Sequence, residues 1–154
     1  MKSQSKPKLF GDALLGSSTP AEFLGSMIQS STEYSVIVKD LDGGVILWNL
    51  GAQRLYGYSP DEIIGRSATV LHAPEDIALE RPRQMREAAL KEGKWEGVLD
   101  RITKDQLRLT CRVVMTPYFD ESGKALGFVL ISKDVSTEFR LREQIGRASC
   151  RERV

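Results

Sequence analysis

The side chains that most often perform catalysis are few in this 154-residue chain. It contains one histidine, His72, and two cysteines, Cys111 and Cys150. A catalytic triad that uses histidine would need His72, and the sequence has no glycine-rich phosphate loop, no Cys-x-x-Cys pair, and no His-Glu-x-x-His or Gly-x-Ser-x-Gly motif. The carboxylates mostly lie where turns and helix caps are expected, which explains them without catalysis. We therefore do not expect this chain alone to be an enzyme.

Composition and charge narrow the class of protein further. The chain is 41% hydrophobic and 28% charged, with a net charge of +1, as is typical of a globular domain that buries its own core. This charge gives no reason to expect nucleic acid as a partner. The longest apolar run has about seven residues, far fewer than the roughly 18 that span a bilayer, and no apolar segment follows the N-terminal lysines. The two cysteines suggest neither a disulfide nor a metal site. We expect a cytoplasmic protein with no membrane contact in this segment.

Two apolar segments in the C-terminal half have the patterns of paired strands. In residues 107–115 every second residue is apolar and the others are mostly polar, as in a strand with one face on a core. An acidic, glycine-containing turn at 118–124 leads into residues 126–131, which are apolar on both faces, as in a central strand. These patterns predict a long antiparallel hairpin that ends at Asp134, after which the sequence becomes helical.

A second hairpin and a series of short helices are expected upstream. Strands at 34–39 and 45–48 are joined by the turn 40–44. Asn49 is then a suitable N-cap for a helix that stops at Gly57.

The segment between the two hairpins is less regular. A capping box at Ser59–Glu62 opens a one-turn helix that closes at Gly65. A further helix could start at Pro74, and Pro82 should break it, so the main helical piece is expected at 83–92. A third strand at 95–103 completes an α+β fold, a five-stranded antiparallel sheet with short helices on one face.

Motifs along this region closely resemble those of the PAS sensory domain, with the elements in the right order from about residue 28 to 136. Trp95-Glu96-Gly97, Pro117 and the closing Asp134-Val135-Ser136 fit the pattern, whereas Gln106 stands where the family usually has glycine. The residues that carry the structural signature are Asp42, Gly43, Asn49, Gly57, Tyr58 and Gly65.

The resemblance implies a sensory and interaction module of a signalling protein, most often a histidine kinase of a two-component system. Its final strand would pass a movement to the helix that follows, with Asp134 and Ser136 at the junction. We expect a flexible basic segment at 1–19, a flanking helix at 20–33 and the PAS domain at 34–135. An output helix should follow at 136–145, and a tail at 146–154 has the composition of a cloning remnant.

Cofactor chemistry known in the family finds little support in these residues. Photosensory flavin members carry a reactive cysteine where this chain has Ala68, so no flavin–cysteine adduct can form. Haem-binding members usually take a histidine from the helix at 75–92, which has none, and a lone His72 is more often a surface or capping residue. Non-covalent flavin near Trp48 or Trp95 has no supporting motif, since ordinary packing explains each tryptophan. We expect no cofactor, and neither haem nor flavin.

Three functional hypotheses remain open. The first is a sensor that binds a small ligand on the inner face of the sheet; the second is a ligand-free scaffold that forms a homodimer through the N-terminal helix and the outer sheet face; the third is a haem- or flavin-bound redox or gas sensor. Under the first, nine residues are expected to face the helices and line a pocket, although a simple role in filling the core is favoured over a preformed cavity: Val36, Val38, Leu47, Leu55, Tyr56, Leu109, Cys111, Val113 and Met115.

Overall fold

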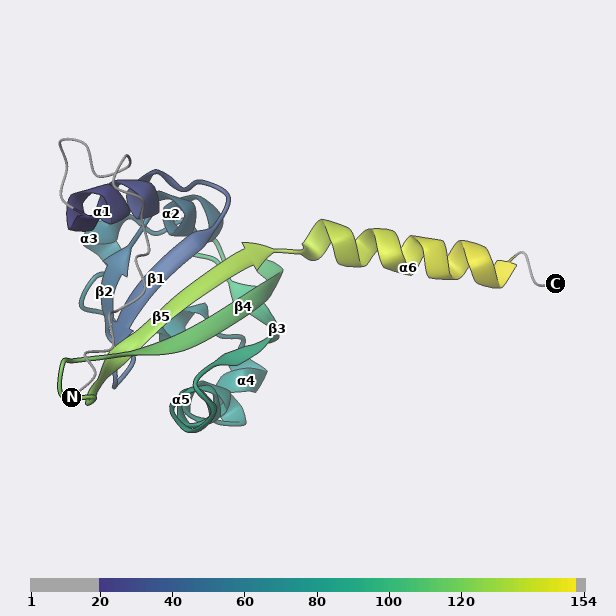
Figure 1. Cartoon of the computed structure of the whole chain (residues 1–154). Helices are drawn as coiled ribbons and strands as arrows, with labels where there is room; N and C mark the ends of the chain where they lie inside the picture. The colour runs from purple at the N-terminus through teal and green to yellow at the C-terminus, as the bar shows by residue number, and fades with distance from the viewer. Residues whose placement is uncertain (1–19, 152–154) are drawn as a thin grey trace, which may run out of the picture.

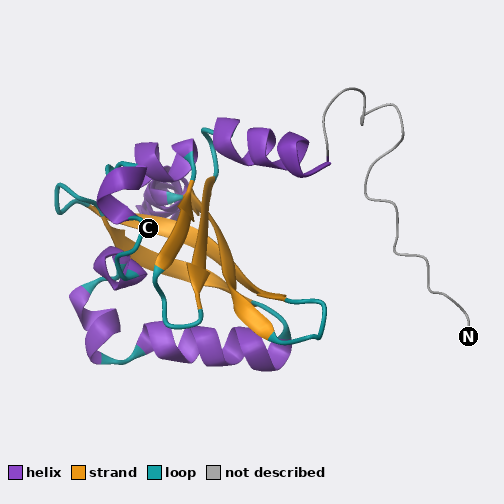
Figure 2. Ribbon diagram, turned by 90° about the vertical axis from the view of Figure 1, so that its left-hand side faces the viewer, coloured by secondary structure: helices purple, strands orange, loops and turns teal. Residues whose placement is uncertain are grey.

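The computed structural model describes residues 20–151. Its centre is a curved five-stranded antiparallel sheet in the order β2-β1-β5-β4-β3 (Figure 1). Figure 2 views the sheet from the side and shows short helices packed along it. The predicted fold class is confirmed. The strands are β1 Ser35–Asp40, β2 Val45–Trp48, β3 Trp95–Ile102, β4 Arg108–Phe119 and β5 Ala125–Asp134.

The helices begin and end close to where the caps predict. Asn49 caps α2 through its side chain, and Gly57 ends that helix in the left-handed conformation at φ +85°. Ser59 and Glu62 form the predicted capping box of α3. The helical elements are α1 Pro20–Ser30, α2 Leu50–Tyr56, α3 Pro60–Ile63, the 3₁₀ helix η2 Ala68–Leu71, α4 Pro74–Ala78, α5 Arg81–Glu92 and α6 Ser136–Arg151.

Three helix boundaries differ from the predictions. The flanking helix α1 ends at Ser30 instead of residue 33. Helix α5 begins at Arg81, because Pro82 occupies the first turn, where its missing N–H costs no hydrogen bond. Helix α6 continues to Arg151, six residues beyond the predicted end of the output helix at 145. The expected basic segment at 1–19 lies outside the described residues.

The core lies between the inner face of the sheet and the helices. Trp48 and Tyr56 pack with ring centroids 5.7 Å apart, and the ring of Tyr58 meets Trp48 edge-on at 6.4 Å. The indole Nε1 of Trp48 donates to the Tyr58 carbonyl at 2.8 Å. From the long hairpin, Cys111, Val113, Met115, Phe128 and Leu130 complete this core.

The β1–β2 register places three of the expected pocket residues on the wrong face. Val38 pairs with Leu47, and Val36 pairs with Ile131 of β5. Along β1 the buried positions are Ser35, Ile37 and Lys39, so Val36 and Val38 point to the outer face with Leu47. An irregularity in the pairing opposite Val38 and Lys39 breaks the alternation on β2, where Val45 and Trp48 are both buried.

Candidate functional site

Three basic side chains lie inside the domain. Lys39 of β1 and Arg101 of β3 are each 2% exposed, and His72, which follows η2, is 4% exposed. Such side chains are rarely buried to this extent unless they are paired. The prediction of His72 as a surface or capping residue was wrong, because the chain from η2 runs inward and makes a backbone bridge with Arg101.

The arginine and the histidine contact each other directly. Arg101 Nη1 lies 3.1 Å from His72 Nε2, and we assign the guanidinium as the donor because it cannot accept. Burial, followed by the charges of Arg101 and Lys39, lowers the pKa of His72 to about 2. The imidazole is therefore neutral at physiological pH and carries its proton on Nδ1. Among the described residues neither His72 Nδ1 nor Arg101 Nε has a hydrogen-bond partner.

Lys39 is the second buried cation. Its Nζ lies 5.9 Å from the centroid of the Phe128 ring, and no carboxylate of residues 20–151 forms a salt bridge with it. Burial, followed by the charges of Arg101 and Arg86, lowers its pKa to about 7, although the charge of Asp40 acts in the opposite direction. The inner face thus holds two buried basic side chains that can carry charge, Lys39 and Arg101.

A hydrogen bond links Tyr56 of α2 to the central strand β5. Tyr56 Oη lies 2.9 Å from Ser132 Oγ of β5, and both residues are buried. Burial raises the pKa of Tyr56 to about 12 and that of the Cys111 thiol to about 11. Cys111 is therefore an unreactive thiol at neutral pH, as the sequence predicts.

The end of β5 is fixed to β4 where α6 begins. The Val135 amide donates to the Thr110 carbonyl at 2.8 Å, and the Thr110 amide donates to Ser136 Oγ at 2.9 Å. Asp134 Oδ1 accepts from the Ser136 amide at 2.8 Å, which pairs the first backbone N–H of α6. Val135 is buried, while beyond it α6 projects away from the domain (Figure 1).

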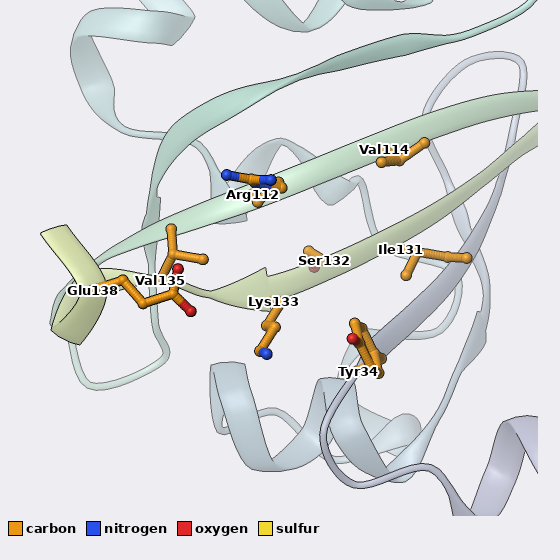
Figure 3. A pocket seen from close by; sticks show the side chains of 8 residues that line it. All are labelled: Tyr34, Arg112, Val114, Ile131, Ser132, Lys133, Val135 and Glu138. Atoms are coloured by element: carbon orange, nitrogen blue, oxygen red, sulfur yellow. The ribbon is translucent and has the colours of Figure 1, made fainter.

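A hollow of about 270 Å³ opens on the outer face beside this junction. Figure 3 shows Arg112 and Val114 along β4 and Ser132 and Ile131 along the adjacent β5, with Glu138 of α6 at one end. Its wall is completed by Tyr34, Lys133 and Val135.

The structure brings together six of the nine expected pocket residues, namely Leu55, Tyr56, Leu109, Cys111, Val113 and Met115. They pack against one another on the inner face, and their role as ligand contacts stays a prediction. Sequence reasoning missed Lys39 and Arg101. The available signal was their spacing, because each lies two residues from an apolar inner residue of its strand, Ile37 and Leu99.

The residues of the structural signature lie at turns and caps. Gly43 and Gly65 adopt φ +96° and +87°, values that favour glycine. Asp42 lies in the β1–β2 turn, where Asp40 Oδ1 accepts from the amides of Asp42 and Gly44 at 2.9 and 2.8 Å. The turn is therefore held mainly by Asp40.

These features define a sensory-domain fold, and comparison with known proteins identifies the family. The family model described as "PAS domain" matches residues 33–137, and the chain belongs to this family. A crystal structure of the PAS domain of a protein from Colwellia psychrerythraea is 26% identical, with a TM-score of 0.71 over 76% of this chain and 98% of that chain. An RNA-binding light-oxygen-voltage receptor has a TM-score of 0.74 at 18% identity, covering 97% of this chain and 41% of that chain, which shows the fold alone.

Two curated relatives are much longer than this chain. "Two-component system protein A" of Emericella nidulans is 30% identical over 110 residues, which are 71% of this chain and 16% of that protein. Phototropin-2 of Oryza sativa subsp. japonica is 29% identical over 110 residues, which are 70% of this chain and 12% of that protein. Within residues 20–151, no helix has both the length and the apolar character to cross a membrane.

Proposed function

We propose that this PAS domain is the sensory module of a two-component signalling protein, such as a histidine kinase. It responds to a small ligand at the inner face of the sheet and passes the response to α6. The similarity to a two-component system protein supports the first part. The second part rests on the physical continuity between the inner face, β5 and the start of α6.

The observation that carries the proposal is a chain of contacts along β5. Tyr56 in the core is hydrogen-bonded to Ser132, and two residues later Asp134 accepts a hydrogen bond from the Ser136 amide, the first of α6. Because β5 is the central strand and only Val135 separates it from α6, a small displacement of β5 changes the direction or register of that helix.

The similarity to light receptors does not make this chain a light sensor of the same chemistry. Ala68 occupies the place at which photosensory flavin members of the family have a cysteine, and it is buried in η2. Alanine has no thiol, so these residues do not fit a flavin–cysteine adduct.

Hydrogen exchange tests the connection between core and helix. In Tyr56→Phe, loss of the hydrogen bond to Ser132 should lower the stability of this region by about 1 kcal/mol. Exchange of the Val135 and Phe139 amides should therefore become about fivefold faster. The matched control is Tyr118→Phe, since Tyr118 is half-buried on β4 and makes no hydrogen bond through its hydroxyl in the described chain. Unchanged exchange at both amides in Tyr56→Phe would contradict the proposed connection.

Asp134→Ala examines the other end of the same connection. It should fray the first turn of α6 and leave the core amides protected from exchange. The output of a signalling protein that carries this domain would then no longer respond to changes at the inner face. Asp120→Ala is the control, because Asp120 makes similar bonds to Ser122 and Lys124 at the opposite end of β5. Equal output from the wild type and Asp134→Ala would exclude a relay role for Asp134.

A second candidate function, homodimerisation, is supported by the outer face of the sheet. Ile131 and Val98 are 44% and 43% exposed there. Together with partly exposed valines of neighbouring strands they give this face an apolar surface of the kind that marks interfaces, with Arg112 beside Val98. The valines are Val36, Val38, Val114 and Val129.

Sedimentation equilibrium distinguishes this interface from pairing through α6. Ile131→Arg should convert a dimer to a monomer, because it places a charge at the centre of the apolar surface. Ile145→Arg makes the same change on α6, where Ile145 is exposed, and should leave the dimer intact. A dimer broken only by Ile145→Arg would place the interface on the helix, and a wild-type monomer would rule out the scaffold function.

A further inference from the structure

The buried cations of the inner face have no salt-bridge partner in the described chain. Lys39 and Arg101 are almost fully buried, yet neither forms a salt bridge with a carboxylate of residues 20–151. Removing a cation from water costs several kcal/mol, roughly, unless an anion and further hydrogen bonds compensate. Elsewhere in the same domain basic residues do have acidic partners, as Arg108 has with Glu75 and Asp100. Lys39 and Arg101 therefore differ from the surface basic residues because they are buried without such a partner.

The guanidinium of Arg101 is oriented by one contact and free at another atom. Its Nη1 meets His72 Nε2, and its Nε makes no hydrogen bond despite being buried. A guanidinium binds a carboxylate or phosphate through two parallel N–H groups on one edge. The edge formed by Nε and Nη2 is thus available for such an anion, while His72 holds the plane of the group.

Two other cations converge on the same region. Lys39 and Arg101 come from strands that are not neighbours, but the charge of Arg101 acts on Lys39 across the curved sheet. Arg86 of α5 is half-buried, and its charge acts on both Lys39 and His72. Its Nη1 would lie 3.6 Å from a Cβ at Gly43, beside the β1–β2 turn. Positive charges from β1, β3 and α5 therefore act on this region, and Asp40 is the acidic group that acts against them on Lys39.

We propose that the inner face binds a compact oxyanion, a carboxylate or a phosphate, between the free edge of Arg101 and the ammonium of Lys39. The inference rests on the proposed function, because it names the ligand class of the same inner face. His72 positions Arg101 and stays neutral. The ligand is compact because large buried side chains occupy the surroundings, among them Trp48, Tyr56, Met115 and Phe128.

Titration of the 154-residue chain tests the site with defined probes. Inorganic phosphate, acetate and succinate are added separately at pH 7 and constant ionic strength, with chloride as the reference, and amide chemical shifts are followed by NMR. At least one oxyanion should shift the amides of Lys39, His72 and Arg101 saturably. The probe that saturates these shifts at the lowest concentration shows whether the site prefers a phosphate or a carboxylate.

Three variants show which residues bind the oxyanion. Lys39→Met and Arg101→Met should weaken binding at least tenfold. Arg112→Met, an arginine exposed on the outer face of β4, should bind as the wild type does. If Arg101→Met does not fold, the chemical shifts of the wild type and of Lys39→Met still test whether the site exists. No saturable shift with any oxyanion, or a response that chloride reproduces or that Lys39→Met retains, overturns the site.

The two proposals fail separately. If no oxyanion binds but Tyr56→Phe still speeds exchange at the start of α6, the relay stands and the ligand class is wrong. If an oxyanion binds and neither it nor Tyr56→Phe alters exchange in α6, the site stands and the relay is wrong.

Discussion

Replacing Asn49 with alanine is expected to lower the free energy of unfolding by about 4 kcal/mol, since it removes a helix cap and leaves several buried backbone groups unpaired. Asn49 is fully buried. Its Oδ1 accepts from the amides of Val36 and Ala52, both at 2.8 Å, and its Nδ2 donates to the carbonyls of Ile28 and Tyr34 at 2.8 and 3.1 Å. One side chain therefore joins α1, the start of β1 and α2. Urea denaturation monitored by tryptophan fluorescence measures the loss.

Two further variants separate the parts of this effect. Asn49→Asp keeps both accepted bonds but turns a second oxygen toward carbonyl oxygens, so it should also destabilise by more than 2 kcal/mol, roughly. Ser59→Ala removes an exposed N-cap of α3 and should cost about 1 kcal/mol. An Asn49→Ala loss no larger than that of Ser59→Ala would show that Asn49 acts as a cap alone.

The local chemistry of caps and turns is what made most of the fold predictable. Asn49, Gly57 and the Ser59–Glu62 pair each favour one conformation over a few residues, and the structure has α2 and α3 where they indicate. The alternation of the long hairpin was equally informative, because Cys111, Val113 and Met115 are all fully buried in one row.

What the sequence could not supply was the register of β1 and the path after η2. Counting apolar residues favours Val36 and Val38 as the inner positions, since both are better core residues than Ser35 or Lys39. In the structure, Val38 pairs with Leu47 and Val36 with Ile131 on the outer face, so Lys39 points inward. The contact of His72 with Arg101 joins residues 29 apart in the chain, so no local pattern could reveal it.

The buried lysine predicts an unusual dependence of stability on pH. Lys39 has a pKa of about 7 in the folded chain and an ordinary value of 10.5 when exposed. Between these two pH values the unfolded state binds more protons, so stability rises with pH through this window. One pKa unit corresponds to about 1.4 kcal/mol, so the gain across the window is about 3–5 kcal/mol. Below pH 7 both states are protonated and the full cost of burying the charge is present.

Lys39→Met isolates this contribution, because the uncharged side chain has a similar length. The variant should be more stable than the wild type by about 3 kcal/mol at pH 6.5, and the difference should shrink toward pH 10. Urea denaturation of both proteins measures it. Cys111 and Tyr56 have raised pKa values, so they lower stability above pH 9 in both proteins, and their effect cancels in the difference. A difference that does not change with pH would show that Lys39 titrates normally.

The same comparison links the lysine to its proposed ligand. An oxyanion that contacts the ammonium favours the charged form, so it should raise the pKa of Lys39 and stabilise the wild type most at pH 7 and below. At saturating phosphate or succinate, the stability of the wild type should therefore increase much less between pH 7 and 9. The stability of Lys39→Met should not respond to the anion. If both proteins gain equally from the anion, the effect comes from the surface or the solvent. A response confined to the wild type would mean that the inner face keeps its lysine for a ligand and tolerates the cost in stability when that ligand is absent.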